Sequence, residues 1–218
     1  MVFVCGIDEA GRGPVIGPLV ICGVLADEEQ EQKLMELGVK DSKMLTPVQR
    51  ERMFDKIIQI VEKYEIVAVQ PAEIDSVVGK GKSNNLNWLE ADKSAEIINK
   101  LKPNKAILDC PSTNIKAYTD YVKRKITGRA DIVAEHKADQ NYPIVSAASI
   151  LAKVTRDELI QDIKKKYKIE FGSGYPSDPL TQIFIKQNWD KFDFFRKSWE
   201  SYKQIVKGKS QTKLFSEE

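Results

Sequence analysis

The N-terminal segment constrains the fold more than any other part of the chain. An apolar run at 2–7 ends at two adjacent carboxylates, Asp8 and Glu9, and a Gly-Arg-Gly turn follows at 11–13. A second apolar run covers 19–25. Short apolar runs bounded by Gly and Pro are typical of buried strands. The sequence therefore predicts two strands joined by a glycine-rich turn. Because an unpaired buried carboxylate is costly, it also predicts a functional site beside that turn.

The glycines of this turn allow a second interpretation. Gly11, Gly13 and Gly17 approach the spacing of a dinucleotide-binding turn, which requires a helix directly after the glycines. Pro14 and a run rich in Val, Ile and Leu follow instead, which favours a strand. Acids before the glycines would also repel a pyrophosphate unless a metal ion lay between them. We therefore favour the strand, turn and strand arrangement.

Length and composition are those of an ordinary globular protein. The chain has 218 residues, of which 42% are hydrophobic and 30% are charged, as expected for one large domain or one domain with a helical appendage. No apolar run reaches the roughly 18 residues of a membrane span, and the N-terminus lacks the basic and apolar regions of a signal peptide. We expect a cytoplasmic monomer without membrane association.

The three cysteines, Cys5, Cys22 and Cys110, lack the spacing of metal-binding or redox pairs. A sparse and odd number of cysteines is typical of reduced thiols in an intracellular protein. Cys5 and Cys22 lie in the two apolar runs, so we expect both of them in the core.

Basic residues concentrate in the C-terminal third, although the net charge of the chain is only +2. The segment 186–213 has eight basic residues and three acidic ones. A basic region beside an acidic site fits a polyanionic substrate that one part holds and another part cleaves. A solvated lysine-rich surface gives the same pattern, so the charge alone leaves both interpretations open.

The order of the remaining elements predicts an α/β fold, in which strands alternate with helices and the first strands are antiparallel. Further strands are predicted at 66–69, 106–108 and 132–134. Helices are predicted at 33–37, 47–64, 86–101, 114–126 and 143–167, and near 180–189 and 196–207 after a loop at 172–179. We expect a mixed five-stranded sheet flanked by helices. Residues 1–170 would form the catalytic domain, and 171–218 a helical substrate-binding region with a basic tail.

Four acids lie at or just beyond the predicted carboxyl ends of strands: Asp8, Glu9, Asp109 and Asp139. In α/β sheets, ligands gather at this edge. Carboxylates without His or Cys partners prefer hard cations such as Mg²⁺ or Mn²⁺, and the single histidine, His136, argues against zinc. Two such ions about 4 Å apart activate water and stabilise the leaving oxygen of a phosphodiester. Paired acids also serve glycoside hydrolysis, but the basic region and the Gly-Arg-Gly turn favour a phosphate substrate.

Adjacent residues on a strand point to opposite faces, and this limits how the first two acids can act together. Asp8 and Glu9 face one metal pair only if the strand breaks at Ala10 and Gly11 and lets Glu9 turn, or if Glu9 contributes its backbone carbonyl. We therefore expect Asp8 to be the stronger ligand and to bridge the two ions.

Several residues could contact a nucleic acid. Gly11 and Gly13 lack Cβ atoms and allow close approach to their N–H groups, and Arg12 between them could grip a phosphate; a plain tight turn is the alternative. Tyr175 between Gly and Pro could stack on a base or sugar or pack on the core. Along the long helix, one face carries polar and basic residues that could follow a phosphate backbone or form a solvated stripe. These are Ser146, Ser149, Lys153 and Arg156.

Five segments together resemble the type 2 ribonuclease H family (ribonuclease HII), in its archaeal single-chain form. They are 6–14, 41–43, 136–139, 146–153 and 174–178. The resemblance implies a ribonuclease H-like sheet with a C-terminal helical region. It implies endonucleolytic cleavage of the RNA strand of RNA–DNA hybrids and incision at single ribonucleotides in duplex DNA. A non-catalytic hybrid-binding module and another nuclease of the same superfold are the alternatives.

The resemblance also implies roles for individual residues. The family's metal-binding acids correspond to Asp8, Glu9, Asp109 and Asp139, which would hold two divalent ions, Mg²⁺ or Mn²⁺. The turn formed by Gly11, Arg12 and Gly13 would read the ribose 2′-OH at the RNA–DNA junction. Tyr175 would pack at that junction, and Lys43 and Ser146 would lie near the substrate backbone.

Archaeal members of this family often end in a sliding-clamp binding motif. In that motif a glutamine, two residues, an aliphatic residue and two further residues precede two aromatics. Gln211 and Leu214 begin the pattern here, but Glu217 and Glu218 stand where the aromatics belong, and Phe215 does not restore the spacing. The tail is therefore a possible clamp-binding segment with an incomplete motif, or a frayed basic terminus.

Overall fold

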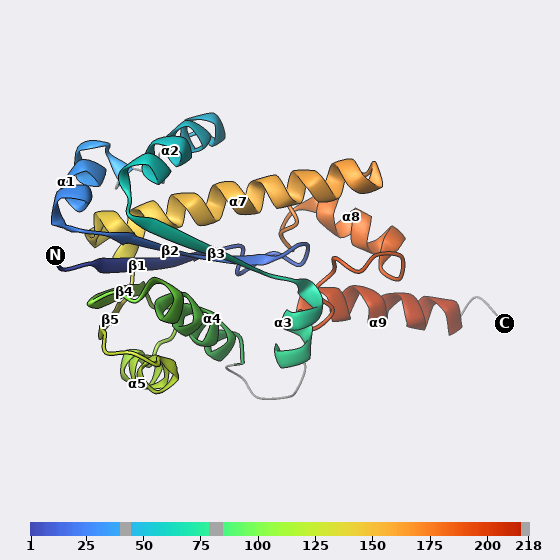
Figure 1. Cartoon of the computed structure of the whole chain (residues 1–218). Coiled ribbons are helices and arrows are strands. Elements are labelled where there is room, and N and C mark those ends of the chain that lie inside the picture. The colour runs from blue at the N-terminus through green and yellow to red at the C-terminus, as the bar shows by residue number, and fades with distance from the viewer. Residues whose placement is uncertain (40–44, 79–84, 215–218) are drawn as a thin grey trace.

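The computed structural model describes residues 1–39, 45–78 and 85–214. One five-stranded sheet has the order β3-β2-β1-β4-β5 (Figure 1). The strands are β1 Val4–Ala10, β2 Leu19–Ala26, β3 Lys63–Val69, β4 Lys105–Asp109 and β5 Asp131–Glu135. The first three strands pair antiparallel, whereas β4 pairs parallel with both β1 and β5. The predicted mixed five-stranded α/β sheet is confirmed.

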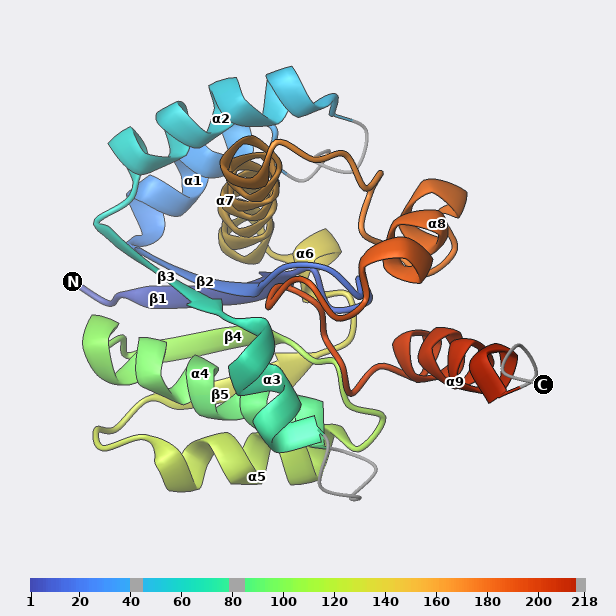
Figure 2. The same cartoon turned by 90° about the vertical axis from the view of Figure 1, so that its right-hand side faces the viewer.

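Helices cover both faces of this sheet (Figure 2). The helices are α1 Glu28–Glu36, α2 Pro47–Ile60, α3 Pro71–Val78, α4 Asn85–Leu101, α5 Ile115–Lys125, α6 Ala138–Asn141, α7 Pro143–Tyr167, α8 Pro179–Asn188 and α9 Glu200–Leu214. One core joins the sheet to α4 and α5, and a second joins it to α1, α2 and α7. Cys5 belongs to the first core and Cys22 to the second, as predicted.

Helix α7 packs directly against β1, the strand that contains Asp8 and Glu9. Gly6 makes this contact possible, since a Cβ atom there would come within 2.5 Å of the backbone carbon of Ile144. Backbone cannot give way as a flexible side chain can, so a larger residue would push the helix off the strand. The face of α7 that the sequence left as either a phosphate track or a solvated stripe is in part covered, with Ser146 and Ser149 fully buried.

Some element boundaries differ from the sequence-based predictions. The helix predicted at 47–64 ends at Ile60, because Val61 is extended and β3 already begins at Lys63. Helix α3 was not predicted; it follows β3 at once and buries Ile74. The last helix begins at Glu200 rather than at 196.

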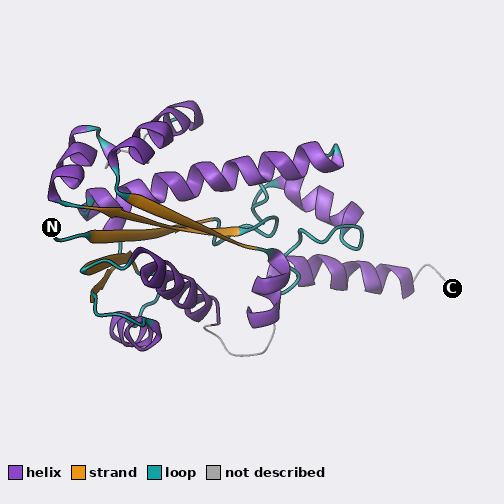
Figure 3. Ribbon diagram, viewed as in Figure 1, coloured by secondary structure: helices purple, strands orange, loops and turns teal. Residues whose placement is uncertain are grey.

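After α7 the chain continues through loops and the helices α8 and α9 (Figure 3). An aromatic cluster that includes Phe171, Phe184 and Phe195 packs on Val15 and Ile16 of the β1–β2 connection. A single antiparallel bridge pairs Ile16 with Phe195. The C-terminal region is therefore fixed to the glycine-rich turn, and the division at residue 170 stays a prediction. Among the described residues, no helix is long and apolar enough to span a membrane.

Candidate active site

Sheet topology brings three of the four predicted acids to one edge. Ile7 pairs with Leu108 in the parallel β1–β4 ladder, so the next residue on each strand, Asp8 or Asp109, reaches the same point of the edge. Helix α6 follows β5 and has Asp139 in its first turn. The N–H of Ala138 donates to Oδ1 of Asp109 at 3.0 Å, which ties the start of α6 to the end of β4.

The electrostatics of Asp8 reflect this crowding. Asp8 is only 5% exposed. Burial, and to a smaller extent the Asp109 charge, raise the pKa of Asp8 to about 7, while a hydrogen bond with the Ser149 side chain opposes the rise. Lys153 Nζ in turn donates to Ser149 Oγ at 2.8 Å. Burial is thus the main factor that disfavours the charge of Asp8, and a nearby positive charge would stabilise its ionised form.

Glu9 does not share the face of Asp8. The strand continues through Ala10, which pairs with Val20, so the break that would turn Glu9 toward Asp8 comes only at Gly11. Burial, followed by the charges of Glu90 and Asp8, raises the pKa of Glu9 well above its usual value. Glu90 was not predicted as part of the site.

The surroundings of Asp139 correct one prediction. Ser146 was expected near the substrate backbone, but it is fully buried, and its hydroxyl donates to the backbone carbonyls of Asp139 and Tyr142. It therefore holds α6 on the start of α7 and is not exposed at the surface. On the other side, His136 Nδ1 lies 2.9 Å from the carbonyl oxygen of Cys110 and links β5 to the end of β4.

These acids fit a divalent ion by their chemistry but are not arranged around one. Within the described part of the chain, no three Asp, Glu, His or Cys side chains lie close enough together to hold a metal ion. Oδ1 of Asp8 accepts the N–H of Glu9 at 2.8 Å, and Asp109 accepts that of Ala138. All the donors are carboxylate oxygens, as Mg²⁺ and Mn²⁺ prefer. Burial, and to a smaller extent neighbouring acidic charge, raises the pKa of Asp8 and of Glu9, and a divalent cation would favour the ionised form of each.

The Gly-Arg-Gly turn lies between Arg156 and Tyr175. Gly11 has φ +85°, and a Cβ atom there would collide with the Arg156 side chain. A Cβ on Gly13 would lie 3.4 Å from Cε1 of Tyr175. Tyr175 itself is 44% exposed, so its ring is available on the surface beside the turn. Lys43 lies outside the described residues.

The backbone of the turn is held by residues from the far end of the chain. Arg196 is fully buried and donates from Nε to the carbonyl of Gly17 at 2.9 Å and from NH1 to that of Arg12 at 3.1 Å. Trp199 Nε1 donates to the carbonyl of Gly13 at 3.2 Å. Burial, and then the neighbouring Arg156 charge, lower the pKa of Arg196 to about 9. No local pattern in the sequence predicts these contacts.

Arg12 is not a free phosphate ligand in this structure. Its guanidinium forms an ion pair with Glu90 and a hydrogen bond with Asn87, both on α4. Glu90 is 2% exposed. One sequence signal could have revealed it, because Glu90 stands four residues before Ser94 and seven before Ile97, on the buried face of the predicted helix.

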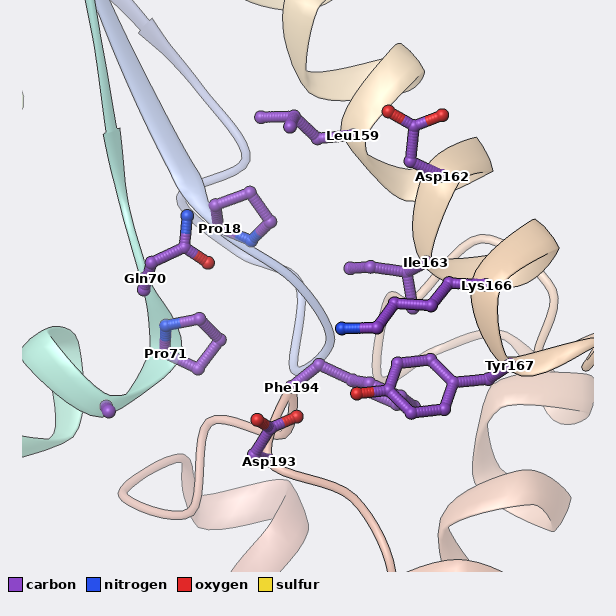
Figure 4. A pocket seen from close by; sticks show the side chains of 11 residues that line it. Pro18, Gln70, Pro71, Leu159, Asp162, Ile163, Lys166, Tyr167, Asp193 and Phe194 are labelled. Carbon is purple, nitrogen blue, oxygen red and sulfur yellow. The ribbon is translucent and has the colours of Figure 1, made fainter.

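Figure 4 shows a separate cavity of about 440 Å³. Pro18, Pro71, Tyr167 and Phe194 are among its lining residues. None of the predicted site residues lines it. The chemistry of the acids therefore belongs to the open edge of the sheet and not to this cavity.

A mixed sheet in this order, with carboxylates at the ends of paired parallel strands, defines a ribonuclease H-like protein. A family model described as Ribonuclease HII matches residues 5–202. Ribonuclease HII of Pyrococcus furiosus is 46% identical over 206 residues, which cover 92% of this chain and 89% of that protein. The chain belongs to the ribonuclease HII family, and is thus an endoribonuclease of the ribonuclease H type.

Solved structures agree with this assignment. The crystal structure of the ribonuclease H2 from Pyrococcus horikoshii OT3 matches with a TM-score of 0.85 and 46% identity, over 94% of this chain and 97% of that one. A chain from the PCNA:RNase HII complex of Archaeoglobus fulgidus matches with a TM-score of 0.82 and 38% identity, over 91% and 96%. Family membership supports ribonuclease H endonuclease activity on RNA–DNA hybrids.

Proposed function

We propose that this chain hydrolyses the RNA strand of RNA–DNA hybrids and also incises duplex DNA at a single embedded ribonucleotide. The observation that carries the proposal is the position of Asp8 and Asp109, each directly after the last paired residue of the parallel β1–β4 ladder. The Gly11–Gly13 turn begins directly beyond the end of β1. A site that joins carboxylates at one edge of the sheet to a partly exposed glycine-rich turn suits cleavage of a backbone phosphate next to a recognised sugar.

The proposed metal ligands are the side chains of Asp8, Asp109 and Asp139 and the backbone carbonyl of Glu9, whose side chain does not share the face of Asp8. Together they would hold two divalent ions, Mg²⁺ or Mn²⁺. Such ions supply an activated water and stabilise the leaving oxygen of a phosphodiester. Bst-RNase HIII, solved in complex with Mn²⁺, has a TM-score of 0.75 with this chain at 18% identity, a likeness of fold alone. Burial raises the pKa of Asp8, and a cation bound beside it would favour its ionised form.

The proposed substrate contacts centre on the turn. Gly11 and Gly13 lack Cβ atoms, so the backbone of the turn can come close to a ribose and its 2′-OH. Tyr175 is exposed beside Gly13 and would pack on the sugar at the junction. Arg12 would act through the shape of the turn, since Glu90 already binds its guanidinium. Lys43 remains a proposed contact.

A single substitution tests the proposal. Asp8→Asn should abolish cleavage of duplex DNA that contains one ribonucleotide, in either Mg²⁺ or Mn²⁺, while salt-sensitive substrate binding persists. All-DNA and all-RNA duplexes serve as controls, because reading of a 2′-OH requires a ribose within DNA. Cleavage at the parental rate by Asp8→Asn would contradict the metal assignment. Equal cleavage of all duplexes would point to another nuclease of the same superfold.

We also propose that the C-terminal tail binds a sliding clamp. The support is the similarity to a chain solved in a PCNA:RNase HII complex and the partial motif at Gln211 and Leu214. Gln211 and Leu214 belong to the end of α9, which points away from the sheet in Figure 1. A bound clamp there would leave the acids open to the substrate.

A further inference from the structure

Glu90 is a buried acid that the proposed chemistry does not use. It lies on α4, is 2% exposed, and pairs through Oε2 with the guanidinium of Arg12. Its other oxygen, Oε1, is buried and has no hydrogen-bond partner among the described residues. A buried carboxylate is costly unless it is paired. The Arg12 contact is therefore what makes an ionised Glu90 tolerable at this position.

Asn87 contributes a second acceptor from the same helix. Its Oδ1 accepts from NH2 of Arg12 at 2.5 Å, while Glu90 accepts from NH1. Residues three apart share one face of a helix, so α4 presents both acceptors together. Arg12 has five N–H donors in a fixed plane, and two of them are bound in this way. Its side chain is thus fixed in orientation as well as in position.

The turn is consequently held from two sides. Arg196 binds the backbone carbonyl of Arg12 at 3.1 Å, and Glu90 with Asn87 binds its side chain. The flanking glycines are conformationally permissive, so they do not fix the turn by themselves. An outside restraint on the residue between them is needed to keep one backbone shape.

We propose that Glu90 is a positioning residue that fixes Arg12 and thereby the Gly11–Gly13 turn in the shape that meets the ribose. The inference rests on the proposed function of this turn. Glu90 would act through Arg12 and would touch neither the substrate nor the metal ions. The competing role is direct: Glu90 lies close enough to Glu9 for its charge to act on it, so it could serve as a further metal ligand.

A double-mutant cycle separates these roles. The variants are Glu90→Gln, Arg12→Ala and the double variant, assayed for kcat and KM on a duplex with one ribonucleotide at saturating Mg²⁺. Loss of a charge-assisted hydrogen bond predicts that Glu90→Gln lowers kcat/KM about tenfold. Arg12→Ala should lower it at least as much, and the double variant no further than Arg12→Ala alone. Glu96→Gln is the matched control on the same helix and should match wild type. The side chain of Glu96 is 52% exposed, and among the ion pairs of the described residues it pairs with Lys93.

A second measurement does not depend on cleavage. Backbone hydrogen exchange of peptides that cover 8–16 should be faster in Glu90→Gln and in Arg12→Ala than in wild type, and unchanged in Glu96→Gln. Asn87→Ala keeps the buried acid but removes the second acceptor for Arg12, so it should also lower kcat/KM and speed exchange at 8–16, to a smaller degree. This variant can replace Glu90→Gln if the latter folds poorly.

Two results would overturn the inference. One is additive losses of kcat/KM in the double variant together with unchanged exchange of the turn. The other is a shift in the Mg²⁺ or Mn²⁺ concentration for half-maximal rate in Glu90→Gln but not in Arg12→Ala, which would assign Glu90 to the metal ions. Absence of cleavage by the wild-type chain would instead count against the proposed function, and the exchange data would still decide the role of Glu90.

Discussion

Trp199 Nε1 donates a hydrogen bond to the carbonyl oxygen of Gly13 at 3.2 Å, across 186 positions of sequence. The guanidinium of Arg196 lies over the same indole, with Cζ 5.0 Å from its ring centroid. Both side chains therefore bind backbone carbonyls of the same turn, Arg196 that of Arg12 and Trp199 that of Gly13. In this fold, the residues that bind the backbone carbonyls of the glycine-rich turn come from the segment that leads into α9, and α4 binds the side chain of Arg12.

Replacement of Trp199 by Phe should reduce activity more than stability. Phe keeps most of the ring but has no donor for the Gly13 carbonyl, so the loss amounts to one exposed hydrogen bond, about 0.5–1.5 kcal/mol. We expect kcat/KM on a single-ribonucleotide duplex to fall about three- to tenfold. Trp88→Phe is the control, because Trp88 packs on Tyr121 with a centroid distance of 4.6 Å. Equal effects of the two substitutions would argue against a specific contact with the turn.

The pKa of Asp8 predicts an unusual pH dependence for the metal-free protein. Its pKa is about 7 in the folded chain and 3.8 as its ordinary value. Between these values the folded state binds the extra proton, so the free energy of unfolding falls as the pH rises from about 4 to about 7. A displacement of this size corresponds to about 4 kcal/mol as an upper bound. Asp8→Asn removes this titration and should be the more stable protein above pH 7 in a chelator.

The measurement is thermal unfolding of both proteins from pH 4 to 8, with chelator and with excess Mg²⁺. Asn cannot replace a carboxylate as a ligand for a hard cation, so Mg²⁺ should raise the Tm of wild type more than that of Asp8→Asn. Asp92→Asn provides a surface control, since Asp92 pairs with Lys125 at the periphery of α4. Parallel pH profiles for wild type and Asp8→Asn would show that Asp8 ionises normally.

The sequence predicted much of what local patterns determine. Apolar runs with Gly and Pro at their ends identified the five strands, and the same pattern placed Asp109 at the end of β4. The prediction was wrong for Asp8, because β1 continues beyond its apolar run to Ala10, which still pairs with Val20 of β2. The capping residue Thr46 and Pro47 gave the start of α2 correctly, since both act within one turn of helix.

The rest depended on contacts that no local pattern encodes. Ser146 has the right spacing for a polar helix face, but only the packing of α7 on β1 decides that this face is buried. The pairing of Arg12 with Glu90 joins positions 78 apart in sequence. The position of Glu90 on the buried face of its helix marks it as unusual, but no local pattern identifies Arg12 as its partner.

Gly11 should be intolerant of any side chain. Gly11→Ala places a Cβ at φ +85° and against Arg156, so both the backbone and the packing oppose it. We expect a loss of about 1–3 kcal/mol in the free energy of unfolding and a loss of cleavage greater than tenfold. Gly128→Ala is the matched control, because a Cβ there meets nothing within 4 Å. Denaturant unfolding and kcat/KM check both; a stable and active Gly11→Ala would show that the turn has another conformation.

Removal of residues 208–218 should separate the clamp from the active site. Asp8 lies on β1, Asp109 on β4 and Asp139 on α6, and the turn follows β1. The C-terminal residues that bind the turn, Arg196 and Trp199, precede the segment that is removed. The shortened chain should therefore cleave a short duplex with one ribonucleotide at a rate within about twofold of the full chain. Addition of a sliding clamp should stimulate the full chain on long or circular DNA and leave the shortened one unchanged.

The substitution Leu214→Ala in the full chain is the finer test, because it removes only the aliphatic residue of the partial motif. A large loss of cleavage on the short duplex after truncation would mean that the basic tail binds nucleic acid rather than a clamp, and its steep decline with salt would identify that contact.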